Sequence, residues 1–271
     1  MIVDAHTHIS RLQNSDFEAA TFAKNFERLL REMKANRVDH AMLLPWYENK
    51  DPRRPSMHGL LELGKGVKQI SVVGAYDVEA GTPSDLAELD ALLRERKIVG
   101  VKLYTGYQHF YPSDARCAPV YKLCERYGAP VIFHSGDTLK YKTSAKVKYA
   151  HPLNIDEVAV DHPDLKIIIA HLGNPWLVDT AEVLYRNDNV YADLSGLVLG
   201  DDLGSPYGKM MKQRIRELML YASPRKLLYG TDWPLAPIKS YIKFVKGLGI
   251  KKNDLEYVMW KNAADLFKIK I

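Results

Sequence analysis

The chain has 271 residues, of which 46% are hydrophobic and 26% are charged, an ordinary composition for a globular protein. Lysine and arginine total 38 and aspartate and glutamate total 33, and this small excess, +5 in formal charge and spread along the chain, argues against a nucleic-acid partner. No stretch approaches the roughly 18 apolar residues of a membrane span and no signal peptide is visible, so we expect a cytoplasmic protein that does not bind a membrane.

Eight short apolar runs recur along the chain and are the predicted strands. They cover residues 1–5, 39–46, 69–76, 98–104, 129–134, 165–171, 189–196 and 226–232. Several of these runs are continuously apolar rather than alternating, which is typical of parallel strands that are covered on both faces.

Helical patterns alternate with these strands. They are expected over residues 15–33, 82–96, 118–128, 154–160, 174–186, 205–222, 237–249 and 253–267. A capping box from Ser15 to Glu18 predicts one helix start, and Thr82 before Pro83 predicts another. Gly128 is the expected C-cap of the helix that precedes it.

This alternation predicts an α/β protein with the (β/α)8 TIM barrel fold, in which residues 1–271 form one barrel domain. The alternative is a doubly wound open sheet, but no GxGxxG motif follows the first strand. In a barrel, the active site lies at the C-terminal ends of the strands, so the residues at those ends are the candidates for function.

Four histidines and one aspartate stand at these strand ends. His6 and His8 end the first strand, His134 the fifth, His171 the sixth and Asp232 the eighth. Because residues i and i+2 of a strand point to the same side, His6 and His8 can both face the barrel axis. Imidazole nitrogens and carboxylate oxygens suit a cation such as Zn²⁺, which can activate water for hydrolysis.

The chain resembles the amidohydrolase superfamily, specifically the amidohydrolase-related family that also contains aminocarboxymuconate-semialdehyde-type decarboxylases. The matching motifs include VDAHTH at 3–8, GAPVIFHSG at 128–136, HPDLKIIIAHLGNPW at 162–176 and KLLYGTDWP at 226–234. With further motifs in the same order, the resemblance covers essentially the whole chain. It implies a barrel, a divalent metal, and either hydrolysis or non-oxidative decarboxylation.

The resemblance also implies roles for individual residues. His6, His8 and His134 match metal ligands, and Asp232 matches the metal-proximal carboxylate that acts as general base. His171 matches either a group that polarises the substrate or a ligand of a second metal. The implied cofactor is Zn²⁺ or another divalent metal such as Mn²⁺, with one ion favoured and two possible.

Lys102, in GVKLY on the fourth strand, leaves two alternatives open. In binuclear amidohydrolases a lysine at a comparable place is carbamylated and bridges two metals, and His171 would then join Lys102 in holding the second ion. Otherwise Lys102 is a substrate-side group in a site with one metal.

Other residues near the strand ends are candidates for supporting roles. Tyr104 and Tyr107 after the fourth strand, and Trp46 after the second, are candidate substrate contacts, although packing explains them equally well. Asp4 shares a face with His6 and His8 in a regular strand and is expected to orient a ligand or pair with a neighbour. Asp193, at the end of the seventh strand, is interpreted as a structural hydrogen-bonding residue.

The leading functional hypothesis is a metal-dependent hydrolase that acts on a small, carboxylated or cyclic substrate at a C–N or C–O bond. The alternative is a non-oxidative decarboxylase of a carboxylated aromatic or dienic substrate, for which Arg53 or Arg54 could hold the carboxylate. A metal-binding barrel without turnover is a third hypothesis. A deoxyribonuclease of the TatD type is discounted, because Lys102 stands where such enzymes have a bridging acid. The expected partner is a small molecule, and a homo-oligomer is possible.

Overall fold

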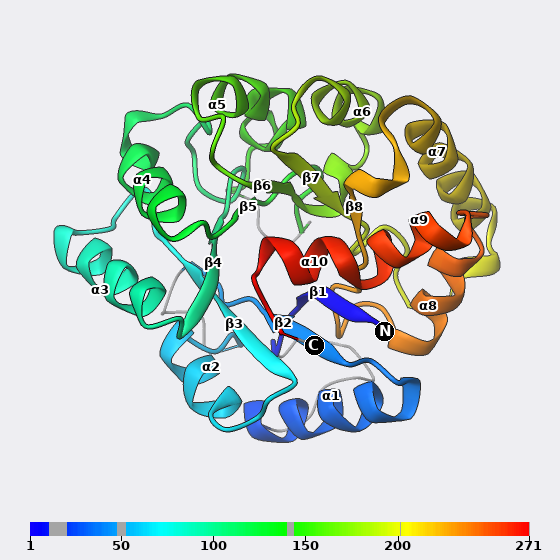
Figure 1. Ribbon diagram of the computed structural model, residues 1–271, viewed down its shortest axis with the longest axis horizontal. Coiled ribbons are helices and arrows are strands. Elements are labelled where there is room, and N and C mark those ends of the chain that lie inside the picture. Colours follow the sequence, from blue (N-terminus) through cyan, green and yellow to red (C-terminus); the bar gives the residue numbers. More distant parts are fainter. Residues whose placement is uncertain (11–20, 48–52, 140–143, 201, 271) are drawn as a thin grey trace.

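Eight parallel strands follow one another around a barrel in the order β1 to β8, and helices surround it (Figure 1). The computed structural model describes residues 1–10, 21–47, 53–139, 144–200 and 202–270. The strands are β1 (Val3–Thr7), β2 (His40–Leu43), β3 (Ile70–Ala75), β4 (Ile98–Leu103), β5 (Val131–Phe133), β6 (Ile167–Ile169), β7 (Val190–Asp193) and β8 (Leu227–Leu228).

The α-helices connect consecutive strands and close the chain. They are α1 (Phe22–Asn36), α2 (Met57–Gly64), α3 (Pro83–Arg94), α4 (Ala118–Tyr127), α5 (Asp156–Asp161), α6 (Leu177–Arg186), α7 (Pro206–Ala222), α8 (Ile238–Lys246), α9 (Lys252–Glu256) and α10 (Asn262–Leu266). A π-helical turn at Tyr257–Lys261 joins α9 to α10.

Hydrogen bonds between β1 and the chain from β8 onward join the two ends of the sheet. The backbone N–H of Ala5 donates to the carbonyl of Tyr229 at 2.9 Å, and that of His8 donates to the carbonyl of Trp233 at 2.7 Å. The sheet therefore curls round on itself, and the (β/α)8 barrel expected from the sequence is confirmed.

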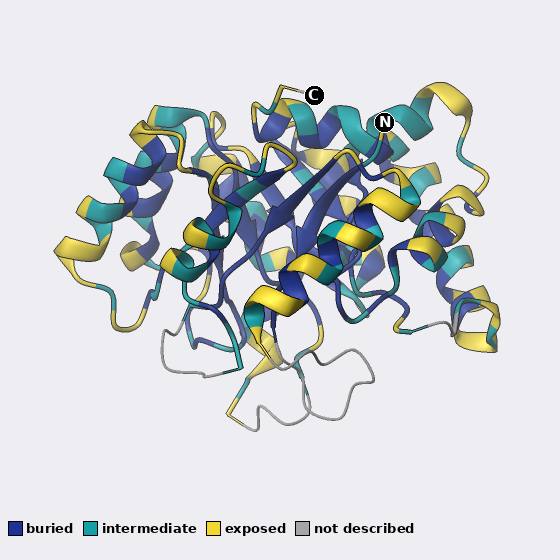
Figure 2. Ribbon diagram, turned by 90° about the horizontal axis from the view of Figure 1, so that it is seen from below, coloured by how far each residue is buried: buried dark blue, intermediate teal, exposed yellow. Residues whose placement is uncertain are grey.

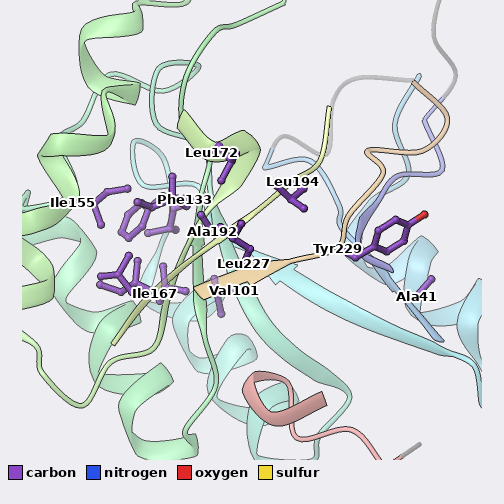
Figure 3. Close-up of a cluster of buried hydrophobic side chains, with 14 of the residues drawn as sticks. Ala41, Val101, Phe133, Ile155, Ile167, Leu172, Ala192, Leu194, Leu227 and Tyr229 are labelled. Atoms are coloured by element: carbon purple, nitrogen blue, oxygen red, sulfur yellow. The ribbon is translucent and has the colours of Figure 1, made fainter. Parts of the chain in front are cut away.

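Two apolar clusters cover the two faces of the strands. The first fills the barrel interior with side chains such as Met42, Ile132 and Leu228, and α10 closes its N-terminal end with Leu266 and Phe267. The second lies between the strands and the surrounding helices, and Figure 3 shows part of it. Figure 2 shows that the strands are mostly buried and that the helices are exposed on their outer sides. This double coverage is why the strands are continuously apolar in sequence.

Several helix boundaries agree with the sequence signals. Thr82 is the N-cap of α3, where its hydroxyl accepts from Asp85 N–H at 3.3 Å and its own N–H donates to the Asp85 carboxylate at 2.8 Å. Gly128 ends α4 with a φ of +59°, a left-handed conformation that glycine adopts without a Cβ clash.

Other boundaries differ from the expectation. The predicted capping box of Ser15 and Glu18 lies outside the described residues, and α1 begins at Phe22 with Thr21 as its N-cap. Helix α2 was not predicted, because its segment is only eight residues long and contains two glycines, Gly59 and Gly64, which lower helix propensity. Within the described part of the chain, no helix is both long and apolar enough to cross a membrane.

Candidate metal centre

A cavity of about 130 Å³ opens among the C-terminal ends of the strands. Its lining residues are His6, His8, Ser10, Trp46, Arg54, Lys102, Tyr104, Tyr107, His134, Asp137, Thr138, Leu139, His171, Gly196, Leu199, Asp232, Pro234 and Leu235. Apart from Arg53, every residue that the sequence nominated for catalysis, metal binding or substrate binding therefore lines one cavity, which lies where a barrel carries its active site.

His6 lies at the end of β1 and is almost fully buried. Its Nδ1 is 2.8 Å from Oδ2 of Asp193. Because an ionised carboxylate only accepts hydrogen bonds, Nδ1 carries the proton and Nε2 presents a lone pair. Among the described residues, this buried Nε2 has no hydrogen-bond partner. A buried lone pair without a donor is costly unless it has a ligand.

His8 presents its Nε2 in the same way. Its Nδ1 donates to the carbonyl of Leu44 at 2.8 Å, and burial lowers the pKa of His8 to about 3, so the ring is neutral at pH 7. The free Nε2 lies 3.3 Å from Oδ1 of Asp232. Two atoms that both offer lone pairs thus face each other with no proton between them.

A bound cation would remove the repulsion between these lone pairs by accepting both of them. One ligand atom each from His6, His8 and Asp232 lies within 4.8 Å of the others, and Asp232 Oδ1 is 3.8 Å from His6 Nε2. Two ligand atoms that are about 2.1 Å from a tetrahedral zinc ion are roughly 3.4 Å apart. The observed separations are close to this value, so the residues present fit a small divalent metal ion.

Asp232 reaches this position because the chain after β8 is tied to β1. The N–H and hydroxyl of Thr231 donate to the buried carboxylate of Asp4 at 3.0 and 2.7 Å, and the N–H of Asp232 donates to the carbonyl of His6 at 2.8 Å. Asp232 itself has a φ of +61°, an uncommon conformation for a residue other than glycine.

Asp4 does not share the cavity-facing side of His6 and His8. The pairing of β1 with β2 shifts register between Asp4 and Thr7, which interrupts the regular alternation on which the expectation rested. The other half of the expectation holds, since Asp4 pairs with a neighbour, Thr231, and so supports the loop that carries Asp232.

Asp193 accepts hydrogen bonds from both His6 and His171 and so links these two residues of the histidine cluster. Besides the bond from His6, it accepts hydrogen bonds from the N–H of His171 at 2.9 Å and from the N–H of Ser195 at 3.1 Å. The hydroxyl of Ser195 also donates to it. Burial opposes ionisation of Asp193, but its interactions with His6, His171 and Lys102 together outweigh burial and hold its pKa well below the usual range.

These bonds also fix the tautomer of His171. Because the single hydrogen of the Ser195 hydroxyl points to Asp193, its oxygen accepts from Nδ1 of His171, at 2.8 Å. His171 Nε2 is then left to bind or carry a proton. His6, His171 and Asp193 form a second group with metal-ligand spacing. The hydrogen bonds of Asp193 with His6 and His171 explain why these three residues lie so close together without a metal ion. Ser195 was not among the residues predicted from the sequence, where its only signal is its position two residues after Asp193.

His134 lies beyond the end of β5 and lines the same cavity. Its Nε2 donates to the carbonyl of Asp137 at 3.1 Å, which leaves Nδ1 unprotonated, and its ring centre is 5.2 Å from that of His171. Among the described residues, the groups with metal-ligand spacing do not include it. Its predicted role as a ligand therefore stays a prediction.

Lys102 lies on β4 and is fully buried at the cavity. Its Nζ has no hydrogen-bond partner among the described residues. Burial lowers the pKa of Lys102 to about 8, while the charges of Asp193 and Asp232 act in the opposite direction. The amine is therefore mainly protonated at pH 7.

An aromatic cluster borders the cavity beside Lys102. The ring centre of Trp46 is 4.4 Å from that of Tyr104 and 4.8 Å from that of Tyr107. The hydroxyl of Tyr104 donates to the carbonyl of Pro45, so it is used within the protein and the ring is what remains for a ligand. Arg54 stacks on Trp46, with its Cζ 3.8 Å from the ring centre.

The chain is similar to known decarboxylases and hydrolases. It is 26% identical to a gamma-resorcylate decarboxylase of Polaromonas sp. (strain JS666) over 236 residues, which cover 77% of this chain but only 65% of the length of that relative. A probable 2-pyrone-4,6-dicarboxylic acid hydrolase from Acinetobacter baumannii, with citric acid bound, has a TM-score of 0.70 at 16% identity and covers 98% of this chain and 99% of that chain.

A third similar protein is a dihydroxybenzoic acid decarboxylase from Polaromonas sp. JS666 with bound manganese and the inhibitor 2-nitroresorcinol. It has a TM-score of 0.68 at 16% identity, over 98% of this chain and 96% of that chain. At such low identities the structural matches establish a shared fold. Residues 73–269, from β3 to the C-terminal region, match the amidohydrolase family. The resemblance inferred from the sequence motifs is thereby confirmed, and the chain belongs to the amidohydrolase family.

Proposed function

We propose that this protein is a metal-dependent, non-oxidative decarboxylase of a small carboxylated aromatic or dienic compound. The observation that carries the proposal is Arg54, which lines the cavity against Trp46 while His6, His8 and Asp232 occupy the same cavity. A guanidinium matches a carboxylate in geometry and charge, and the aromatic rings match the flat face of a conjugated substrate.

The comparisons support this alternative better than hydrolysis, which the sequence analysis placed first. The sequence relative that covers 77% of the chain is named a decarboxylase, as is a protein of similar fold that binds manganese and a resorcinol derivative. Among structures of similar fold, a hydrolase and a decarboxylase match about equally well, with TM-scores of 0.70 and 0.68 at 16% identity each, so the preference for decarboxylation comes from the sequence relative.

The site residues suit the steps of decarboxylation. The reaction breaks the C–C bond to the carboxylate, leaves the electron pair on the substrate carbon, adds a proton there and releases CO₂. Arg54 would bind an acidic group of the substrate, and Trp46 would stack against the substrate ring and fix its orientation. His171 fits the role of proton donor, because Ser195 fixes its Nδ1 and leaves Nε2 to carry the proton. A single divalent cation, Zn²⁺ or Mn²⁺, bound by His6, His8 and Asp232 would supply a Lewis acid that polarises a substrate oxygen.

The direct test measures CO₂ release from 2,6-dihydroxybenzoate by the protein loaded with Zn²⁺ or Mn²⁺, with chromatography of the 1,3-dihydroxybenzene product. We expect turnover that is lost in the chelated protein and in the His8→Ala variant. Arg54→Met should raise KM at least tenfold. Arg53→Met is the matched control, because Arg53 is the neighbouring residue and does not line the cavity, and it should keep the wild-type KM.

Hydrolysis is the second candidate. It is favoured by Asp232, a carboxylate beside the histidine nitrogens that can take a proton from water. Incubation with 2-pyrone-4,6-dicarboxylate distinguishes the two, since hydrolysis opens the ring without releasing CO₂. If the protein opens the ring of 2-pyrone-4,6-dicarboxylate but releases no CO₂ from 2,6-dihydroxybenzoate under the same conditions, the decarboxylase proposal is rejected.

A further inference from the structure

We propose that Lys102, beside Tyr104, forms a second anion-binding position in addition to Arg54 beside Trp46, so that the site selects a flat substrate with two acidic groups. This inference rests on the proposed function only in assuming that the cavity binds the substrate. It adds a specificity-determining residue and narrows the substrate class to planar diacids, in which either acidic group is a carboxylate or an acidic hydroxyl.

The first support is the burial of the Lys102 side chain and the lack of a hydrogen-bond partner for its Nζ among the described residues. The side chain is completely buried and lines the cavity. An ammonium group can donate three hydrogen bonds, and leaving them unmade in a buried place costs several kcal/mol. A bound anion would supply the missing acceptors.

The two carboxylates whose charges act on Lys102, Asp193 and Asp232, do not supply those acceptors. Asp193 already accepts from His6, His171 and Ser195. Asp232 points one oxygen at the Nε2 atoms of His6 and His8. Both raise the pKa of Lys102 through their charge, yet neither is in contact with its Nζ. The charges of the two carboxylates therefore favour the ammonium form of Lys102, but they leave its three N–H donors available to a ligand.

The second support is that both cations adjoin the aromatic wall formed by Trp46 and Tyr104. Arg54 Cζ lies 3.8 Å from the centre of the Trp46 ring, Trp46 lies 4.4 Å from Tyr104, and Lys102 Nζ lies 5.6 Å from the centre of the Tyr104 ring. Each of the two neighbouring rings thus has its own cation beside it. A conjugated diacid that stacks on the rings would direct one acidic group to each cation.

Binding of simple aromatic acids to the metal-loaded protein tests this arrangement without requiring turnover. The probes are benzoate, benzene-1,3-dicarboxylate and benzene-1,4-dicarboxylate, measured by calorimetry with wild type and with Lys102→Met, Arg54→Met and Lys209→Met. Methionine preserves the length and apolar stem of lysine, and Lys209 is an exposed lysine of α7 that serves as the matched control.

We expect wild type and Lys209→Met to bind at least one diacid tenfold or more tighter than benzoate. Lys102→Met should abolish this preference while it changes the Kd of benzoate less than twofold, and Arg54→Met should weaken benzoate itself. An unchanged preference in Lys102→Met, an equal loss for benzoate and diacid, or no preference in wild type would each overturn the proposal.

The metal content of each variant is measured in the same samples. Loss of metal from Lys102→Met would overturn the proposal as well, because it would place Lys102 among the metal-binding groups. The two proposals fail separately: diacid selectivity without CO₂ release would reject only decarboxylation, whereas CO₂ release without diacid selectivity would reject only the role of Lys102.

Discussion

His6 and Asp193 are joined by a buried hydrogen bond of 2.8 Å between Nδ1 and Oδ2, although they lie 187 residues apart in the chain. The bond decides which nitrogen of His6 carries the proton, and it turns the other nitrogen toward His8 and Asp232. In metal sites, a carboxylate in this position orients the histidine and raises its basicity.

Asp193→Asn should therefore weaken metal binding by about 10- to 100-fold. The amide can present a donor to Nδ1 of His6, and this would favour the tautomer that places the proton on Nε2. Competition with a chromophoric chelator for Zn²⁺ measures the affinity. Asp161→Asn, at an exposed position of α5, should leave it unchanged, and equal affinities in all three proteins would contradict the role given to Asp193.

Elemental analysis of protein purified without added metal tests the ligand set. We expect close to one equivalent in wild type and in Lys102→Met, and a strong loss in His8→Ala. His134→Ala should also lose metal if its free Nδ1 is a ligand, whereas His58→Ala, at an exposed histidine, should not. Two equivalents in wild type that fall in Lys102→Met would instead indicate a carbamylated lysine between two ions.

The tie between Thr231 and Asp4 should stabilise the fold and position Asp232. Thr231→Val removes the hydroxyl that donates to Asp4 and accepts from Trp233 N–H, and it leaves buried polar groups unpaired. The expected loss is about 1–3 kcal/mol in the free energy of unfolding, together with weaker metal binding. Thr231→Ser keeps the hydroxyl and should behave nearly as wild type in chemical denaturation, so equal losses in both variants would argue against the hydrogen bond.

Replacement of Lys102 should increase stability at the expense of ligand selectivity. Burial lowers the pKa of Lys102 to about 8, which means that the folded protein disfavours the charged form. Lys102→Met removes a buried charge whose Nζ has no hydrogen-bond partner among the described residues and should raise the free energy of unfolding by about 1–3 kcal/mol. Thermal denaturation of the metal-free proteins measures the effect, and a lower melting temperature in the variant would show that Lys102 is paired in the folded protein.

His40 should make the protein less stable in mild acid. It is buried, its Nε2 is 2.9 Å from the Ser71 hydroxyl, and burial lowers its pKa from 6.5 to about 4. The folded protein therefore resists a proton that the unfolded chain accepts, so this stability is present above pH 6.5 and is lost as the pH falls toward 4.

Denaturation of wild type and His40→Gln at pH 7.5 and pH 5 isolates this effect from other titrating groups. Wild type should lose about 1–2 kcal/mol more than the variant between the two pH values. An equal loss in both proteins would show that His40 does not titrate differently on folding.

Local patterns in the sequence were sufficient to predict most of the architecture. The eight strands and the helix ends at Thr82 and Gly128 were predicted correctly because apolar runs, caps and glycine act through neighbouring residues. Helix α2 was missed because its short segment has a weak pattern, and its N-cap Ser56 carries little information alone.

The sequence by itself determined that His6, His8, His134, His171 and Asp232 stand at strand ends, and a barrel necessarily gathers such ends at one rim. It could not determine which of their atoms face one another. The register shift in β1, the left-handed backbone at Asp232 and the bonds from Asp193 to His6 and His171 depend on contacts between distant segments. Those long-range contacts set the histidine tautomers and bury Lys102 with no hydrogen-bond partner for its Nζ among the described residues, so only the tertiary structure decided the chemistry that the site offers.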